Sequence, residues 1–401
     1  MRARYAVPGI LVALAGLAWT QFALTPSASP GTSGLTHEAA VRAPAPGRAL
    51  PSGSTGSRVV VVREQSEPLE ILATDLSVPW DVGFLPDGTL LIAERGGRVL
   101  HLTADGRSEI AHPAVRARGE GGLLGLLVHP RFEENRHVYL YRTLETEGRI
   151  ENQVDRFVYE QEDELLRDPV TIIGNIPGAL YHDGGRMEWG PNGKLYITTG
   201  DAQEPALAQD PGSLAGKILR LNHDGTVPYD NPTSGSPVFS LGHRNPQGIA
   251  WDAAGRMWSS EHGPSLPGFC CRDEINQIEA GANYGWPEIT AGQRRSGLRA
   301  PYLHSGTAAT WAPGGLTYLD GSLCFAGLRG EALYQVPIER SDGTLIDDPE
   351  LIRHFQGEYG RLRTTRLGPD GLLYLTTSNT DGRGTPREGD DKLIRIDPTI
   401  F

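Results

Sequence analysis

The hydrophobic positions of this chain recur in one pattern, a polar turn followed by an apolar strand. Asp-Gly or Asn-Gly often forms the turn, and between two β-rich runs it is a strong hairpin signal because both residues accept positive φ. Six copies follow one another, about 45–65 residues apart. They are Phe84–Ala93, Val128–Tyr141, Trp189–Thr198, Trp251–Trp258, Thr317–Phe325 and Leu367–Leu375. Each copy predicts two neighbouring antiparallel strands.

Repeats of this length are typical of a β-propeller, in which each repeat forms one four-stranded blade. We therefore predict an all-β, six-bladed β-propeller. A pair of β-sandwiches is the alternative scaffold, but it does not explain the even recurrence of the turn. In a propeller the ends of the inner strands surround a central channel. Polar clusters that are far apart in the sequence are expected to meet there.

The N-terminal segment has the features of an export signal. Arg2 and Arg4 precede an apolar run from Ala6 to Leu24, so residues 1–24 are predicted to be a signal peptide or an uncleaved membrane anchor. Residues 25–58 are rich in Ser, Pro, Gly and Ala, which predicts a disordered linker. We assign the propeller to residues 59–401 and predict an exported protein, whether periplasmic, extracellular or anchored at the cell surface.

The net charge limits the binding partners of the protein, and the cysteines limit its disulfides and metal sites. The formal net charge is −12, and this argues against nucleic acid as the main partner, because binding a phosphate backbone needs stripes of Lys and Arg. The cysteines are Cys270, Cys271 and Cys324, and their spacing matches no zinc pattern. A disulfide between the adjacent pair and a bridge from either of them to Cys324 are both compatible with the sequence.

Candidate chemical groups stand at the expected blade connections. Glu120 lies within the glycine-rich segment Gly119–Gly122, where the backbone can approach a ligand; a solvated Glu on a simple glycine turn is the alternative. His182 precedes the third repeat and suits a general base, because the imidazole pKa lies near neutrality. Arg361 and Arg363 alternate along a strand, so both guanidiniums are expected on one side, a geometry suited to planar carboxylates.

The densest polar stretch, Gly242–Pro287, completes a set of motifs. They are Pro79-Trp80, Glu120–Leu124, His182–Arg186, Gly216–Arg220, Gly242–Gly248, Glu261–Pro264, Asp273–Asn276, Asn283–Pro287, Ala312–Gly315 and Arg361–Arg363. In this order they resemble the soluble quinoprotein sugar dehydrogenases, the glucose/sorbosone dehydrogenase family that uses pyrroloquinoline quinone (PQQ). The resemblance extends from about Leu76 to Pro398 and is close to the shorter aldose-type members.

The resemblance implies a role for each matching residue. His182 would take the proton from the anomeric hydroxyl of an aldose sugar while hydride passes to PQQ, which yields the lactone. Arg244 and Asn245 would hold the carbonyl region of the quinone, with Arg244 stabilising developing negative charge. The remaining cofactor contacts would be Glu120, Arg329, Arg361 and Arg363. A sugar substrate and an external electron acceptor are the implied partners.

Calcium is the second cofactor that the resemblance implies. The backbone carbonyls of Gly263 and Pro264 would hold one Ca²⁺ ion beside the quinone, where it acts as a Lewis acid. Glu274 and the carbonyl of Tyr284 resemble a second, structural site, because carboxylate and carbonyl oxygens suit this hard cation.

The chain departs from the family pattern at several positions. Position 120 is Glu where Gln is common, position 329 is Arg where glucose-oxidising members have Lys, and Thr364 stands where an acid often follows the arginine pair. The segment 265–272 is longer than usual and carries two cysteines. Two other functions are therefore considered: a propeller that only binds a protein or glycan, and a calcium-dependent lactone hydrolase. The second would need several carboxylates on one metal ion, whereas this channel is expected to be rich in arginine.

Overall fold

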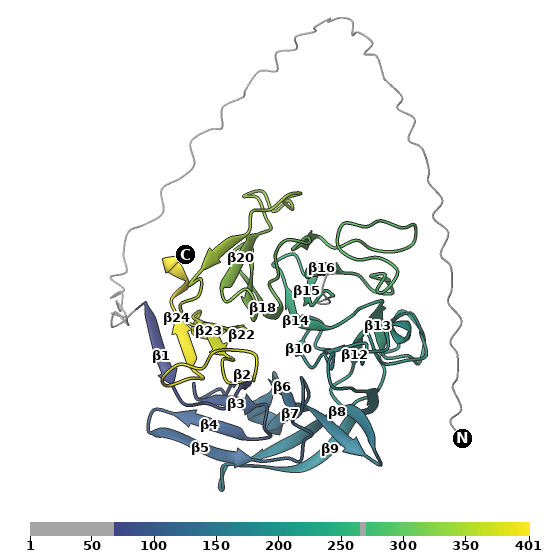
Figure 1. Cartoon of the computed structure of the whole chain (residues 1–401). Helices are drawn as coiled ribbons and strands as arrows, with labels where there is room; N and C mark the ends of the chain where they lie inside the picture. The colour runs from purple at the N-terminus through teal and green to yellow at the C-terminus, as the bar shows by residue number, and fades with distance from the viewer. Residues whose placement is uncertain (1–67, 265–269) are drawn as a thin grey trace, which may run out of the picture. The chain divides into compact units, whose positions relative to one another are not determined.

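The strands of the protein form six four-stranded antiparallel sheets around a common centre (Figure 1). The computed structural model describes residues 68–264 and 270–401. The predicted export segment 1–24, the linker 25–58 and the domain start at Val59 lie outside these residues. Within them, no helix is long and apolar enough to cross a membrane.

The first three blades follow one another along the chain. Blade 1 contains β2 (Pro79–Phe84), β3 (Leu90–Glu94), β4 (Val99–Thr103) and β5 (Gly106–Ala111). Blade 2 contains β6 (Leu123–Val128), β7 (His137–Thr146), β8 (Arg149–Glu160) and β9 (Leu165–Pro177). Blade 3 contains β10 (Met187–Trp189), β11 (Leu195–Thr199), β12 (Lys217–Leu221) and β13 (Val238–Leu241). Each of these three blades pairs its strands in chain order, with the first strand innermost.

The other three blades complete the ring. Blade 4 contains β14 (Pro246–Trp251), β15 (Met257–Glu261), β16 (Glu274–Ile278) and β17 (Leu303–His304). Blade 5 contains β18 (Pro313–Leu319), β19 (Ser322–Gly327), β20 (Leu333–Pro337) and β21 (Ile352–His354). Blade 6 contains β22 (Leu362–Leu367), β23 (Leu373–Thr377), β24 (Leu393–Ile396) and β1 (Leu69–Ala73). The helices of the described residues are short: α1 (Phe132–Asn135), η1 (Pro205–Ala208) and η2 (Pro398–Ile400).

The predicted six-bladed propeller is confirmed, and every predicted repeat is the hairpin between the first and second strands of a blade. In blade 1, for example, Gly88 has φ 86° and the carboxylate of Asp87 accepts a hydrogen bond from the backbone of Thr89 at 2.9 Å. The looser second copy differs because α1 lies between β6 and β7. The repeated pattern therefore marks the connection between the first and second strands of each blade.

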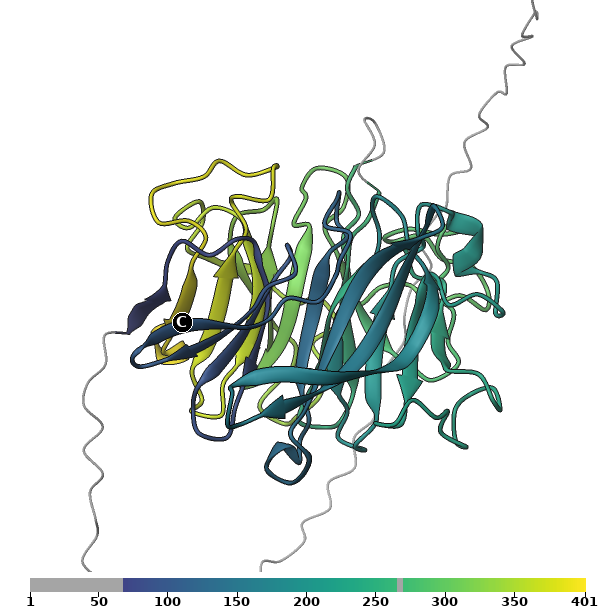
Figure 2. The ribbon, with the colours of Figure 1, turned by 90° about the horizontal axis from the view of Figure 1, so that it is seen from below.

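The ring is closed by strands from the two ends of the described chain. β1 pairs antiparallel with β24, and Leu69 lies opposite Ile396. Each inner strand also contacts the inner strands of both neighbouring blades. Pairing an early strand with the last blade leaves that blade with four strands like the others. Figure 2 shows the strands running between the two faces of the ring, where the loops lie.

Apolar side chains fill the space between neighbouring blades. Among the described residues, six clusters of buried side chains each join strands of neighbouring blades. One of them packs Trp258 and Ile275 of blade 4 against Leu323, Phe325 and Val336 of blade 5. Burial of apolar area is the main favourable term in folding, so these interfaces hold the blades and position the loops at their ends.

A buried ionic network lies in the channel between the inner strands. The Asp81 carboxylate of β2 is fully buried and lies 2.6 Å from the Arg186 guanidinium and 2.9 Å from that of Arg366. It also accepts a hydrogen bond from the backbone of Leu126 at 3.2 Å. Burial alone would raise the pKa of Asp81, but the charges of the two arginines hold it below its usual value. The network therefore connects blades 1, 2, 3 and 6.

A histidine cluster packs between blades 2 and 3. The ring of His129 lies 5.0 Å from that of Trp189 and 5.6 Å from that of His223, measured between centroids. Its Nδ1 atom accepts hydrogen bonds from the backbone of Arg131 and the side chain of Asn135, at 3.0 and 2.9 Å. Burial, and then neighbouring positive groups, lower the pKa of His129 from 6.5 to about 4. The groups that act on it are His223, His137, Arg131 and Arg156.

We expect this cluster to destabilise the fold in mild acid. Because the folded pKa of His129 is lower than the unfolded one, the unfolded chain binds more protons, and stability is lost as the pH falls from about 6.5 towards 4. His129→Asn keeps an acceptor near the Nδ1 position and does not titrate. The difference in urea midpoint between pH 7 and pH 4.5 should shrink in this variant. The same change at exposed His112 should leave it as in the wild type, and an equal effect at both positions would contradict the assignment.

Candidate functional site

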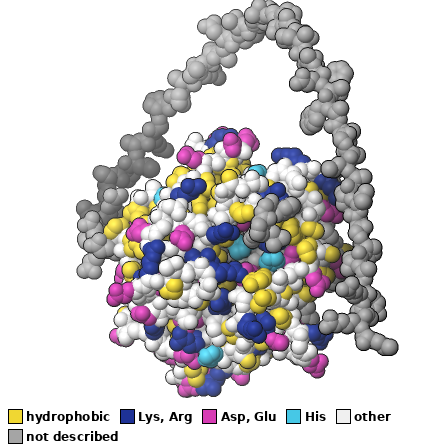
Figure 3. All heavy atoms as spheres, in the orientation of Figure 1, with side chains coloured by type: hydrophobic (Ala, Val, Ile, Leu, Met, Phe, Trp, Pro, Cys, Tyr) yellow, Lys and Arg dark blue, Asp and Glu magenta, His cyan; other side chains and the backbone are white. Residues whose placement is uncertain are grey.

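The polar loops meet at one end of the ring because of how the blades are wound. In an antiparallel pair the start of the first strand and the end of the second lie at the same edge of the sheet. Glu120, His182, Arg244 and Arg361 precede the inner strands β6, β10, β14 and β22, respectively. Other polar groups follow the second strands at the same edge. On the face seen in Figure 3, basic side chains and histidines gather near the centre of the ring.

A cavity of about 750 Å³ opens at this end, within the size range of small-molecule and cofactor sites. Seven of the predicted site residues line it: Glu120, His182, Arg244, Gly263, Pro264, Arg329 and Arg361. Arg363 lines a second, smaller space that Arg361 and Glu120 also line. Asn245 is buried and bonds the carboxylate of Glu120. The structure thus brings together the predicted general base and the predicted cofactor contacts.

His182 is paired with a buried carboxylate. Its Nδ1 atom lies 2.7 Å from Oδ1 of Asp201, which follows β11 and is fully buried. Asp201 also accepts hydrogen bonds from the backbone of Gln203 at 2.9 Å and from the indole of Trp286 at 2.8 Å. A carboxylate on Nδ1 favours the tautomer with the proton on that nitrogen. Nε2 is then free to accept a proton in the cavity.

The glycines around His182 allow its segment to lie against the end of β11. His182 itself has φ 68°, a region that non-glycine residues seldom occupy. A Cβ atom on Gly200 would lie 1.8 Å from the carbonyl oxygen of His182, and one on Gly184 would lie 2.6 Å from that of Thr198. Side chains at either position would push the two segments apart. The motif following His182 therefore fixes the backbone of the base against its own blade.

Glu120 is held as an anion by groups from three other segments. Its Oε2 atom accepts from the backbone of His182 at 2.9 Å and from Asn245 at 3.3 Å, and its Oε1 atom accepts from Arg383 at 2.9 Å. Burial alone would raise the pKa of Glu120, but the charges of His262 and Arg383 and the hydrogen bond from the backbone lower it to about 2.

The glycines beside Glu120 serve contacts within the protein. A Cβ atom on Gly119 would lie 1.9 Å from the carbonyl oxygen of Leu180, and one on Gly122 would lie 2.2 Å from that of Arg95. Both glycines have positive φ. The sequence suggested that this backbone approaches a ligand. Instead, the glycines let it approach neighbouring blades, and it is the side chain of Glu120 that lines the cavity.

Arg244 lies along the cavity wall next to an aromatic ring. Its guanidinium lies 5.4 Å from the ring centroid of Trp286 and donates to the carbonyl oxygen of His262 at 3.1 Å. Burial lowers the pKa of Arg244, although nearby carboxylates oppose the effect. Asn245 accepts from the backbone of Gly184 at 3.0 Å while it donates to Glu120. These contacts hold both side chains in fixed positions.

The arginine pair shares a carboxylate that the sequence did not reveal. Oδ2 of Asp381 accepts from Arg361 Nη2 at 2.8 Å and from Arg363 Nη2 at 3.3 Å. The predicted placement of both guanidiniums on one side is therefore correct. Burial and the neighbouring positive charges lower the pKa of Arg363 to about 10, against the attraction of Asp381. Arg329 lines the same cavity and makes no side-chain hydrogen bond or ion pair with another described residue.

Gly263 and Pro264 lie in a tightly packed turn at the cavity wall. The backbone of Gly263 donates to Asp273 Oδ1 at 3.0 Å, and a Cβ atom at position 263 would lie 2.0 Å from the carbonyl oxygen of Cys271. Asp273 Oδ2 accepts from the backbones of Trp311 and Ala312 at 2.7 and 3.0 Å. Residue 263 must therefore be glycine. Asp273 holds the turn through its bond to Gly263 and is itself held by the backbones of Trp311 and Ala312.

Glu274 lies away from the cavity, in a second cluster of acidic and polar groups. It faces Glu261 across the β15–β16 pair. Burial, and next the charge of Glu261, raise the pKa of Glu274 to about 8. Oδ1 of Asn276, which lies between them on β16, is buried without a hydrogen-bond partner. Tyr284 is buried at the other side of the cluster, where its ring stacks on His243 at 4.8 Å and His243 bonds Glu261.

The adjacent cysteines are joined to each other. Cys270 and Cys271 form a disulfide, and Cys271 lines the cavity next to the Gly263 turn. Cys324 is a buried free thiol on β19, among apolar side chains of blades 5 and 6. Of the pairings that the sequence allowed, the structure therefore has the one within the pair.

Thiol labelling tests this pairing directly. We expect an alkylating reagent to modify one cysteine, Cys324, when the purified protein is unfolded without reductant, and all three after reduction. Peptide mass spectrometry locates the label and detects the disulfide-linked peptide. Labelling of Cys270 in unreduced protein, or a peptide cross-linked to Cys324, would show a different pairing.

Several residues of the site were given no role from the sequence, although His262 and Asp273 stand in the motifs Glu261–Pro264 and Asp273–Asn276. Asp201, Asp273, Asp381 and Arg383 all lie after the second strand of a blade, as does His262, whose Nε2 atom is buried without a hydrogen-bond partner. The repeat pattern does contain a signal for them, because the residues that follow each second strand must face the same cavity. Trp286 belongs to the motif Asn283–Pro287, in which the sequence assigned a role only to Tyr284, and its side chain lines the cavity.

Comparison with known proteins gives the same family as the motifs. The sequence model of the glucose/sorbosone dehydrogenase family matches residues 76–394. The chain therefore belongs to the glucose/sorbosone dehydrogenase family, and the predicted family and enzyme class, a sugar dehydrogenase, are confirmed.

Individual relatives agree with this assignment. The aldose sugar dehydrogenase of Escherichia coli is 31% identical over 82% of this chain and 92% of its own length. The quinoprotein glucose dehydrogenase B of Acinetobacter calcoaceticus is 31% identical over 61% of this chain, but over only 57% of its own length. The PQQ-bound structure of an aldose sugar dehydrogenase from Streptomyces coelicolor is 38% identical, with a TM-score of 0.74 over 82% of this chain and 97% of that one.

Proposed function

We propose that the protein is a PQQ- and calcium-dependent dehydrogenase that oxidises aldose sugars at the anomeric hydroxyl to the lactone. The observation that carries the proposal is the His182–Asp201 pair at 2.7 Å, placed in the same cavity as the arginines of the predicted cofactor site. A base beside a strongly cationic cavity fits the removal of a proton from a substrate next to an anionic cofactor.

The residues present fit PQQ. Arg329 lines the cavity without a partner for its guanidinium among the described residues, and Arg361 and Arg363 share only the one carboxylate of Asp381. This excess of positive charge suits a ligand that carries several carboxylates. Arg244 and Asn245 would hold its carbonyl region. When bound, PQQ supplies the acceptor for the hydride that leaves the sugar carbon.

The residues present also fit calcium. The Gly263–Pro264 turn lines the cavity, and backbone carbonyl oxygens such as those of these two residues are ligands that hard cations prefer. At the second place, the carboxyl groups of Glu261 and Glu274 face each other beside the unpartnered oxygen of Asn276. A cation there would offset the burial and the charge of Glu261, which together raise the pKa of Glu274. We propose that the first ion would polarise the cofactor and the second would support the structure.

The chain's own groups prepare the substrate for hydride loss. Asp201 holds the His182 ring so that Nε2 accepts the proton of the anomeric hydroxyl, and its negative charge stabilises the imidazolium that results. Trp286 and Tyr181 line the same cavity, and their rings offer apolar faces to a sugar. An external electron acceptor would then restore the oxidised cofactor. We further propose that the protein works outside the cytoplasm, because of the export features of residues 1–24.

The cavity carboxylates favour this function over lactone hydrolysis. Glu120 is engaged by Arg383, Asp201 by His182, and Asp273 by backbone donors. A hydrolase of the alternative type would direct several carboxylates at one metal ion. A purely binding propeller would not need the buried carboxylate that orients His182.

Reconstitution of the purified apoprotein tests the proposal. Titration with PQQ in the presence of calcium should give a saturable change in the cofactor spectrum, and chelation of calcium should reverse it. The holoprotein should then reduce an artificial dye when aldose sugars are added, and lactone should accumulate in proportion to reduced dye. Absence of both the spectral change and dye reduction across a sugar panel would overturn the proposal.

A further inference from the structure

One loop reaches both halves of the cavity. Residues 378–391 connect β23 to β24 in blade 6, and we call this segment the 378–391 loop. Its two ends are tied together, because Asp391 accepts hydrogen bonds from the backbone of Asn379 and from the hydroxyl of Thr377. A loop anchored in this way can present side chains at fixed positions.

The first of these side chains, Asp381, holds the arginine pair. Its Oδ2 atom accepts from Arg361 at 2.8 and 3.1 Å, from Arg363 at 3.3 Å and from the hydroxyl of Ser378 at 3.1 Å. Its side chain is only 2% exposed. Its Oδ1 atom accepts from the backbone of Arg383 at 2.8 Å. The same carboxylate therefore orients the arginines and the backbone that carries Arg383.

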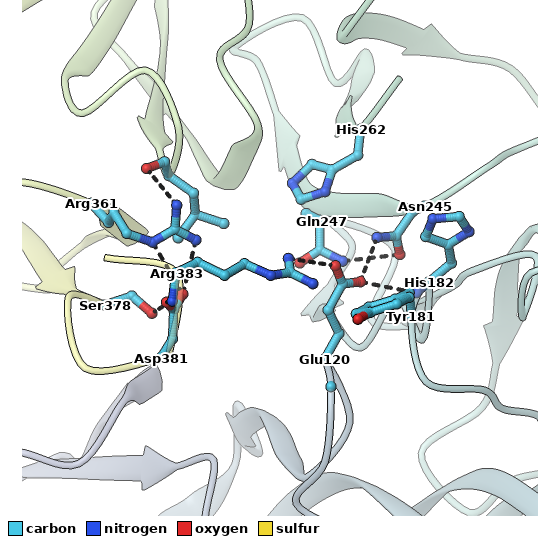
Figure 4. Close-up of polar contacts among 12 residues, drawn as sticks. Glu120, Tyr181, His182, Asn245, Gln247, His262, Arg361, Ser378, Asp381 and Arg383 are labelled. Atoms are coloured by element: carbon cyan, nitrogen blue, oxygen red, sulfur yellow. Dashed lines mark hydrogen bonds and ion pairs between the residues drawn. The ribbon is translucent and has the colours of Figure 1, made fainter. Parts of the chain in front are cut away.

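The second side chain, Arg383, extends across the cavity to Glu120 (Figure 4). Its Nη1 atom lies 2.9 Å from Glu120 Oε1, and its guanidinium lies 5.1 Å from the ring centroid of Tyr181. Glu120 stands at the start of blade 2, whereas Arg383 belongs to blade 6. Blade 1 lies between them in the ring, so this ion pair connects loops that are not adjacent.

Glu120 in turn holds the backbone of the catalytic base. Its second oxygen accepts the amide proton of His182 at 2.9 Å, and the backbone of Glu120 donates to the carbonyl of Leu180 at 2.9 Å. The φ of 68° at His182 is sparsely populated, and such a conformation persists only where the surroundings constrain it. The bond from Glu120 is one of those constraints.

We infer that Arg383 is a positioning residue: through Glu120 it fixes the backbone of His182, and through Asp381 it couples this base to the arginine pair. The inference rests on the proposed function for the role of His182. The contacts themselves are present whatever that role is. An ion pair that served only as a surface contact would have little effect on stability or on the rate, because exposed pairs contribute little to stability. A positioning pair instead alters the rate of the step that His182 performs and the local order of its segment.

A mutant cycle in kcat tests the coupling. Arg383→Gln and Glu120→Ala should each lower kcat about tenfold, since small displacements of a catalytic group have effects of this order or larger. The double variant should be no slower than Glu120→Ala alone, because Arg383 then has no carboxylate to hold. Arg383→Lys keeps the charge and should recover part of the rate. Arg387→Gln, an arginine of the same loop that bonds only backbone carbonyls, should behave as wild type.

Two outcomes of these assays would overturn the inference. Multiplicative losses in the double variant would mean that Arg383 and Glu120 act independently. A rise in KM at unchanged kcat would mean that Arg383 binds the sugar directly. PQQ affinity, measured by titration of the Arg383→Gln and Arg383→Lys apoproteins, should stay within about threefold of wild type, because Arg383 is not among the predicted cofactor contacts, whereas Glu120 is.

Amide hydrogen exchange of the apoprotein provides a readout that needs no cofactor. We expect peptides that contain residues 180–184 to exchange faster in Arg383→Gln and in Glu120→Ala, and as in wild type in Arg387→Gln. Unchanged protection in Arg383→Gln would overturn the inference whether or not the protein binds PQQ. Failure of the wild type to bind PQQ or to oxidise sugars would instead count against the proposed function.

Discussion

His182→Ala is expected to lower kcat for sugar oxidation by about 10²–10⁴-fold, the usual contribution of a general base. His262 also lines the cavity, but among the described residues only the His182 imidazole is oriented by the buried Asp201 carboxylate. The PQQ affinity of the apoprotein should change little, because the cofactor's carboxylates are assigned to the arginines on the other side of the cavity. Dye-linked steady-state assays at saturating PQQ and calcium measure the effect.

Two comparisons make this result specific. His112→Ala replaces a largely exposed histidine and should leave kcat unchanged. Asp201→Asn keeps the shape of the site but offers an amide to Nδ1, so it should slow the reaction without abolishing cofactor binding. A fall in kcat of less than tenfold in His182→Ala would show that another group takes the proton.

The scaffold was predictable because its signal is repeated. A hairpin turn such as Asp87-Gly88 says little alone, but similar turns recur at the equivalent place in the other blades, except blade 2, where α1 lies there. The closing strand β1 was not recognisable, because its five residues carry no turn signal and their partner, β24, is more than 300 residues away. Pairing over such a separation depends on closure of the ring, which is a property of the whole fold.

The site was predictable only where residues belong to motifs. Arg361 and Arg363 share a strand register, so their common direction followed from alternation. Asp381 lies in a loop with no regular structure, and the sequence did not show that it folds back onto them. The glycines around Glu120 were interpreted as room for a ligand, because a sequence cannot distinguish approach to a ligand from approach to a neighbouring blade. Tertiary packing decides both questions.

The buried ionic network at the centre of the channel was not predicted from any motif. Asp81, Arg186 and Arg366 are buried there, and the two guanidiniums depend on one carboxylate for their main charge partner, with Glu188 also bonding Arg366. Burying such charges is costly unless they are paired. The three residues come from β2, β22 and the segment before β10, so the network forms only when the ring has closed. It separates the cavity at one end of the channel from a second hollow at the other, which Arg366 and Glu188 line.

We therefore expect Asp81→Asn to be the most destabilising conservative change in the channel. The amide keeps the shape but leaves two buried cations without their shared anion, and breaking a buried pair in this way costs about 3–5 kcal/mol. Urea unfolding followed by circular dichroism measures the loss. Asp163→Asn, which breaks the exposed pair with Arg167, should cost no more than about 1 kcal/mol. If the two variants were equally stable, the network would be dispensable for ring closure, and the apolar clusters between blades would alone hold the channel together.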